Sequence, residues 1–132
     1  MIFEGMNYVA VIIAAIAGMM IGAVWYGVFA KPWIKAVGFE EDPKPEPKTY
    51  VVALAAQFVI AYILAGLIGH MGEHSLWNGV VSAVFAWLGF TLAPMSVNHR
   101  FQGSGWDLTI IDSGYWFAVF VVMGAIIGWM GV

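Results

Sequence analysis

Four long stretches of apolar residues dominate this sequence, and their length constrains the fold more than any other feature. They cover about residues 7–29, 50–69, 76–97 and 108–130, and only the last contains a charged residue, Asp112. A helix of about 20 mostly apolar residues crosses a bilayer, so each stretch is long enough to span one. The sequence therefore predicts one all-α domain over residues 1–132, a polytopic integral membrane protein with four transmembrane helices in one bundle.

The composition supports this class and excludes several others. Hydrophobic residues make up 62% of the chain and charged residues only 10%, whereas a soluble domain carries roughly a quarter charged residues. Runs such as VAVIIAAIAGMMIGAV do not alternate in polarity, as a transmembrane β-barrel would require. The absence of cysteine excludes thiol catalysis and disulfides. Five basic residues form no stripe that could bind nucleic acid.

The basic residues indicate how the chain is oriented. Four lysines lie between the first two apolar stretches and Arg100 lies between the last two, while the other connections have none. Under the positive-inside rule, both basic loops face the cytoplasm and both termini face outward. We expect a multi-pass protein of the inner membrane, with the lipid bilayer as its first partner.

The cytoplasmic linker over about residues 31–49 changes character halfway. Its first part, KPWIKAVGF, places Trp33 and Ile34 beside two lysines, which is typical of a short amphipathic turn on a membrane surface. Its second part, EEDPKPEPK, alternates proline with charge and favours an extended, solvated segment.

Small residues recur at every fourth position on the first and fourth predicted helices, and a glutamine lies in the middle of the second. Such stripes let helix backbones approach closely in lipid, and a glutamine there is expected to hydrogen-bond a neighbouring helix. We expect these positions to serve helix packing and, through at least one stripe, self-association, although packing within one chain is the alternative. They are Ala14, Gly18, Gly22, Gln57, Gly124 and Gly128.

Residues 96–116, SVNHRFQGSGWDLTIIDSGYW, gather polar chemistry between the third and fourth helices. Helix dipoles explain Arg100 after one helix and Asp107 at the start of the next, and Ser104 with Asp107 has the spacing of a capping box. Asp112 lies about one turn deeper, so we expect it to pair with His99 or Arg100. The predicted cluster at the cytoplasmic face comprises Trp25, Tyr26, Asn98, His99, Arg100, Asp112 and Tyr115.

The sequence gives little support for a metal or cofactor site. His70, Glu73 and His74 follow the H-x-x-E-H order of some zinc peptidases, but that motif needs a helix, and the neighbouring glycines here indicate a turn. These three residues are weak metal candidates only. We predict no catalytic residue and no cofactor.

Two stretches that frame the chain resemble a known family. They are MNYVAVIIAAIAGMMIGAVWYGVFAKPW and VNHRFQGSGWDLTIIDSGYWFAVFVVMGAIIGW, with Trp25, Tyr26, Trp33, Asn98, Phe101, Gly103, Trp106, Gly114 and Tyr115 as the most specific positions. The chain resembles the small bacterial membrane family catalogued as domain of unknown function 1761. The resemblance covers most of the chain, implies a four-helix membrane protein and supplies no activity.

Three classes of function remain open. The first, which we predict, is a structural or accessory membrane protein, not an enzyme, that self-associates or joins a larger membrane assembly. The second is an oligomeric channel or carrier for a small neutral solute, lined by Ser82, Thr91, Gln57 and the polar cluster at the cytoplasmic face. The third is a haem-, quinone- or metal-binding membrane protein that uses His99.

The orientation can be tested with a fusion at the C-terminus. A reporter enzyme that works only outside the cytoplasm should be active when it follows Val132, because all five basic residues fall in the opposite loops. Activity of a cytoplasm-specific reporter at the same point would reverse the predicted topology.

Overall fold

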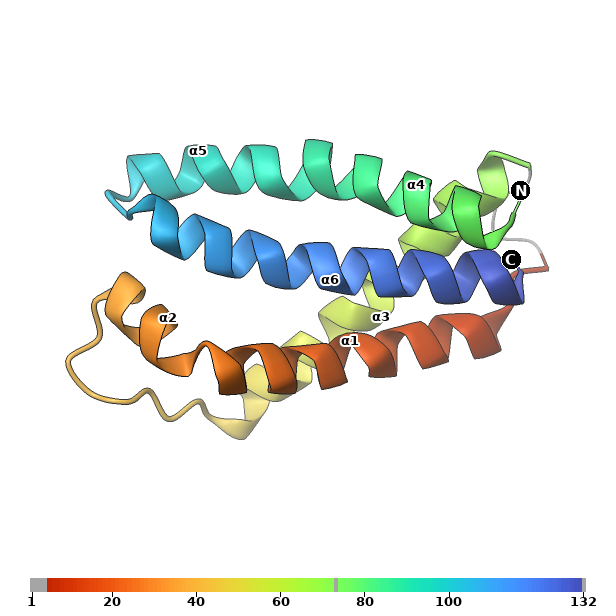
Figure 1. The fold of residues 1–132 in the computed structure, drawn as a ribbon. Coiled ribbons are helices and arrows are strands. Elements are labelled where there is room, and N and C mark those ends of the chain that lie inside the picture. The colour runs from red at the N-terminus through yellow and green to blue at the C-terminus, as the bar shows by residue number, and fades with distance from the viewer. Residues whose placement is uncertain (1–4, 73, 132) are drawn as a thin grey trace.

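The computed structural model describes residues 5–72 and 74–131, which form helices joined by short connections (Figure 1). Four helical spans are long and apolar enough to cross a membrane: Tyr8–Val28, Pro47–His70, Leu76–Phe101 and Trp106–Met130. No strand occurs within the described ranges. The predicted all-α membrane class is therefore confirmed, and the second and third spans are longer than expected.

The first span is α1 (Tyr8–Val28). It begins at Asn7, whose side-chain Oδ1 accepts a hydrogen bond from the Ala10 N–H at 3.1 Å. The same side chain donates through Nδ2 to the carbonyl of Met130 at 3.3 Å. The start of the first span therefore lies beside the end of the last one, and both ends of the chain are at one end of the molecule (Figure 1).

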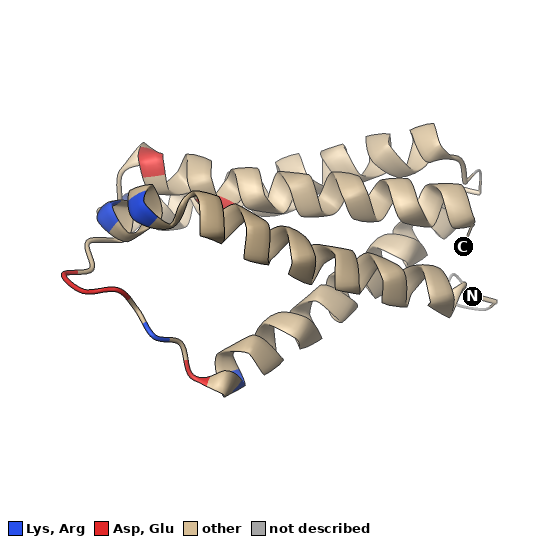
Figure 2. Ribbon diagram, turned by 60° about the horizontal axis from the view of Figure 1, so that its bottom comes forward, with Lys and Arg blue, Asp and Glu red and all other residues tan. Residues whose placement is uncertain are grey.

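A short helix, α2 (Ala30–Val37), follows α1 directly and replaces the amphipathic turn that the sequence predicts. Lys31 and Lys35 are exposed, whereas Trp33 and Ile34 are half-buried, so the two faces of α2 differ as expected. After α2 the linker runs without regular structure to the third helix (Figure 2).

The second span, α3 (Pro47–His70), packs on the other spans mainly from Gln57 onward. Its buried residues all lie from Gln57 onward. In the first half, Tyr50, Val51 and Val52 are between 56% and 68% exposed, and the helix diverges there from α1 (Figure 2). The expectation of one closed bundle is therefore not confirmed.

The third span comprises α4 (Leu76–Trp87), a π-helical turn η1 (Leu88–Leu92) and α5 (Ala93–Phe101). In η1 the Ala93 N–H bonds to the Leu88 carbonyl, one residue farther back than in an α-helix. Pro94 explains the irregularity, because it has no N–H to offer the carbonyl one α-helical turn earlier.

The last span, α6 (Trp106–Met130), lies between α1 and the third span and carries much of the core (Figure 1). Val119, Met123 and Ile127 are fully buried on it. Ala14 and Ala61, from α1 and α3, are also completely buried in the same cluster.

Helices α4 and α6 touch through their backbones. A Cβ atom built on Gly79 would collide with the Gly124 carbonyl, one on Gly124 with the Gly79 carbonyl, and one on Gly128 with the Ser75 carbonyl. Glycine is required at these three positions because the surfaces in contact are main chain. Dispersion at such close range is what drives helix association in lipid.

Replacing Gly79 by alanine should therefore destabilise the protein, by about 1–3 kcal/mol for an overpacked contact. Gly89→Ala is the matched control, because nothing lies within 4 Å of a Cβ at that position. It should leave stability unchanged or raise it by up to about 1 kcal/mol. Thermal unfolding in one mild detergent measures both variants, and equal midpoints would contradict the close contact.

Candidate functional site

A chain of polar and aromatic side chains links three spans, α1, α3 and α6. Gln57 on α3 donates through Nε2 to the Tyr115 hydroxyl on α6 at 2.7 Å. The Tyr115 ring lies 5.2 Å from the ring of Tyr26 on α1, centroid to centroid. The Tyr26 hydroxyl in turn donates to Asp112 Oδ1 at 2.7 Å. We call these four residues the polar seam.

The inner end of the seam is enclosed by protein. Gln57 is 1% exposed and Tyr115 is 7% exposed. The Tyr115 hydroxyl donates to the Gly18 carbonyl at 3.4 Å, so one phenol connects α1, α3 and α6. Water cannot compensate polar groups at this depth, and the three spans must satisfy them together.

Glycine is required at position 18 because of the side-chain oxygen of Gln57. The side-chain Oε1 is buried and has no hydrogen-bond partner among the described residues, and a Cβ built on Gly18 would collide with it. A Cα hydrogen of Gly18 therefore points at this oxygen, in the manner of the weak Cα–H···O contacts found between helices. The predicted hydrogen bond from Gln57 to a neighbouring helix is present, with Tyr115 as its partner.

The small-residue stripes pack within the chain. Ala14 is fully buried, and a Cβ on Gly22 would lie 3.2 Å from the Tyr115 hydroxyl. Gly18 meets Gln57, and Gly124 and Gly128 meet the backbone of α4 and its cap. These positions are filled by the protein's own helices, so contact between copies would need another surface.

The expected pairing of Asp112 with His99 or Arg100 is wrong. His99 Nδ1 lies 2.8 Å from Thr109 Oγ1, and Arg100 Nη2 donates to the same hydroxyl at 2.7 Å. Thr109 precedes Asp112 by one helical turn, so the basic side chains stop short of the carboxylate. Tyr26 reaches that level from α1 and takes the place of the expected ion pair.

Arg100 stabilises the turn between α5 and α6. Its Nη2 also donates to the carbonyls of Ser104 at 3.3 Å and Gly105 at 3.0 Å. Its guanidinium carbon lies 3.6 Å from the centre of the Trp106 ring, a cation–π arrangement. Nε and Nη1 are buried without hydrogen-bond partners, so the indole is the main compensation for that edge of the cation.

The predicted capping box at the start of α6 is also wrong. The N-cap is Gly105 and has no side-chain hydrogen bond, while Ser104 contributes its carbonyl to Arg100. Asp107 Oδ1 accepts from the N–H of the next residue, Leu108, at 2.9 Å. The carboxylate still lies in the first turn of α6, where the positive end of the helix dipole stabilises a negative charge.

Two tryptophans, one on α1 and one on α4, hydrogen-bond to the backbone of α6. Trp25 Nε1 donates to the Ile111 carbonyl at 3.0 Å, and its ring packs where a Cβ on Gly114 would lie, only 2.9 Å away. Trp87 Nε1 on α4 donates to the Ser113 carbonyl at 2.9 Å. The sequence identifies Trp25 but not Trp87, because Trp87 lies within an apolar stretch and has no polar neighbour in sequence to draw attention to it.

The other predicted site residues lie outside the seam. Asn98 is exposed on α5, and its side chain makes no hydrogen bond with the described residues of the predicted cluster. His70 and His74 are exposed at the opposite end of the molecule, and Glu73 lies outside the described residues. Among the described residues, no three histidine, aspartate or glutamate side chains gather into a possible metal site.

The four apolar spans and the polar seam define a small α-helical membrane protein. A family model described as "Protein of unknown function (DUF1761)" matches residues 9–128, nearly the whole chain, and the protein belongs to this family. No curated protein and no solved structure matches the chain.

A double-mutant cycle tests the inner end of the seam. Tyr115→Phe leaves the Gln57 amide buried without its partner and should cost about 1–3 kcal/mol. Combining Tyr115→Phe with Gln57→Leu removes both polar groups, so the double variant should lose less than the sum of the single losses. Reversible unfolding in mixed detergent micelles measures the three variants. Additivity within about 0.5 kcal/mol would mean that the two side chains do not interact.

Proposed function

We propose that the protein is a structural or accessory membrane protein, without catalytic activity, that works through helix contacts with other membrane-embedded chains. A second copy of the chain is the partner we propose first. The carrying observation is the third span, Leu76–Phe101, of whose most apolar window only 6% is buried by the rest of the protein. Together with the exposed first half of α3, this span offers a broad apolar surface to other helices.

The shape of this surface favours a helical partner over lipid alone. An open groove of about 370 Å³ runs between α3, α6 and the third span, lined by apolar side chains that include Ile63, Leu67 and Phe90. Ridges of side chains on one helix fit grooves on another, and small residues allow close approach. Ala55, exposed on the first half of α3, is such a small residue.

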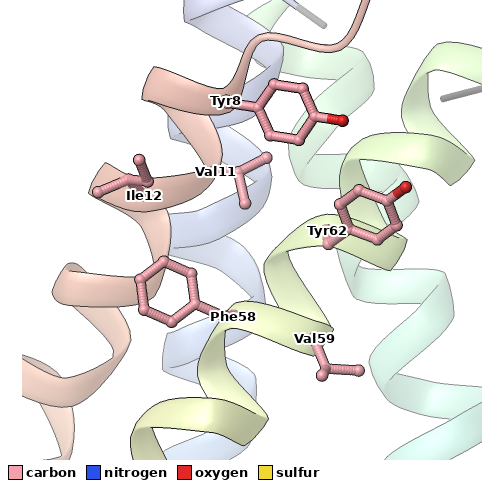
Figure 3. A pocket seen from close by; sticks show the side chains of 6 residues that line it. All are labelled: Tyr8, Val11, Ile12, Phe58, Val59 and Tyr62. Carbon is pink, nitrogen blue, oxygen red and sulfur yellow. The ribbon is translucent and has the colours of Figure 1, made fainter. Parts of the chain in front are cut away.

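A second groove of about 320 Å³ lies between α1 and α3 (Figure 3). Its lining is Tyr8, Val11, Ile12, Phe58, Val59 and Tyr62. Val59 borders both grooves and is 62% exposed, so it forms a ridge between them. A ridge between two grooves is a surface shape on which a helix of another chain can pack.

The polar seam supports a scaffold more than a solute path. Gln57, which the channel reading places in a pore, is bonded to Tyr115 and buried. Beyond it toward the outer side the core is apolar, with Ala65, Ile68 and Ile127 fully buried. The polar groups hold the spans together and do not continue across the membrane.

Cysteine cross-linking tests self-association directly, because the chain contains no cysteine of its own. Val59→Cys and Phe90→Cys should form disulfide-linked dimers in native membranes under mild oxidation. Val24→Cys on α1, which is 67% exposed but borders neither groove, is the matched control and should remain monomeric. Native mass spectrometry from lipid discs should show multiples of 14.4 kDa. A monomer in both measurements would rule out the second copy as partner.

A further inference from the structure

Two acidic residues lie within the four membrane-crossing spans, Asp107 in the first turn of α6 and Asp112 farther along it. Among the described residues, no basic side chain pairs with Asp112. It lies six residues into α6, about 9 Å along the helix from Trp106. One carboxylate oxygen accepts from Tyr26, and the other has no partner in the described part of the chain and is not fully buried. An ionisable group at such depth is costly, and proteins that keep one normally use it.

Aromatic rings adjoin Tyr26, the residue that donates to this carboxylate. The Tyr26 ring meets Trp33 edge to face at 5.7 Å and Tyr115 at 5.2 Å between centroids. Trp116, one turn after Asp112, lies 4.7 Å from Tyr115. Tyr26, Trp33 and Trp116 are only half-buried, so part of each ring remains accessible.

The linker that follows α2 carries a group of acidic residues. The linker that spans from α2 to the diverging start of α3 carries Glu40, Glu41 and Asp42, all exposed (Figure 2). Over residues 38–50 there are four acids and two lysines, a balance of −2. One of these lysines, Lys48, is paired with Glu46 at 2.9 Å.

Nearby cations do not occupy the site. Lys31 and Lys35 are on the exposed face of α2, away from Trp33. Arg100 is held at Thr109 and Trp106, one turn closer to the surface. Asp112 is therefore a charge that a positively charged ligand would compensate.

We propose that Asp112, with the rings of Tyr26, Trp33 and Trp116, binds the ammonium group of an amphipathic organic cation. The carboxylate supplies the counter-charge, and aromatic faces attract alkylated ammonium groups that water solvates weakly. A divalent metal fits less well, because it requires several oxygen ligands and the site has one carboxylate. This site is independent of the proposed scaffold role, since none of its four residues lines either groove.

Binding is measured with the full-length protein in lipid nanodiscs. The probe is radiolabelled benzyltrimethylammonium, detected by a scintillation proximity assay, in discs of phosphatidylglycerol. The wild type should bind it saturably. Neopentylbenzene, which has the same shape without the charge, should not displace it.

Two variants and one control locate the site. Asp112→Asn keeps an acceptor for Tyr26 and removes the charge, and it should weaken binding at least about tenfold. Trp33→Leu should weaken it about threefold to tenfold, as expected for one cation–π contact. Asp107→Asn makes the same change in the first turn of α6 and should stay within about twofold of the wild type. Thermal unfolding verifies that each variant is folded, and Trp33→Leu, which removes no hydrogen bond of the seam, provides the test if Asp112→Asn does not fold.

The ammonium group can belong to a soluble amine or to a lipid head group, and a second disc composition separates them. Adding phosphatidylethanolamine should raise the apparent Kd of the probe if the lipid amine occupies the site, and should leave it unchanged if the ligand is soluble. The proposal is overturned if the wild type shows no saturable binding, if Asp112→Asn binds as the wild type does, or if neopentylbenzene displaces the cation.

Discussion

The hydrogen bond between Gln57 and Tyr115 joins the second span to the rest of the protein, and much of the structure depends on it. A glutamine side chain in hydrocarbon must find a partner, because no water is available there. While its nitrogen bonds to Tyr115, its amide oxygen lies against Gly18, where a Cβ atom would collide with it. One polar residue on α3 thus requires a tyrosine as its partner on α6 and a glycine beside it on α1.

The same constraint explains the tryptophans. An indole N–H buried in a membrane needs an acceptor, and helix carbonyls are the acceptors at hand. Trp25 and Trp87 bond to the carbonyls of Ile111 and Ser113, which lie in the first half of α6. They hold α1 and α4 against α6 at the level of the seam. In the second half of α6, glycine contacts with α4 take over that role.

The anchoring of α1 and α4 to α6 contrasts with the packing of α3. From Gln57 onward α3 is held by this residue and by buried alanines, but its first turns are exposed and no other described helix covers them. The divergence leaves apolar surface on α3 uncovered. The proposed scaffold role rests on this uncovered surface, whereas the proposed cation site rests on the contacts of Asp112.

The sequence by itself determined the class, the spans and the membrane-facing chemistry of this protein. Charge-free apolar stretches have few alternatives, because a helix satisfies its own backbone hydrogen bonds in lipid whatever its neighbours are. The small-residue spacing likewise identified the positions of close packing, and the midspan glutamine identified a polar contact between helices.

Only the tertiary structure decided which partners these residues have. Asp112 bonds to Tyr26, 86 positions away in sequence, instead of the basic residues a short turn away. Ser104 offers its carbonyl to Arg100 instead of capping α6. Spacing along one helix reports which side chains share a face, whereas the rotation and crossing of two helices set which faces meet. Those angles arise from packing over the whole interface, and no local pattern contains them.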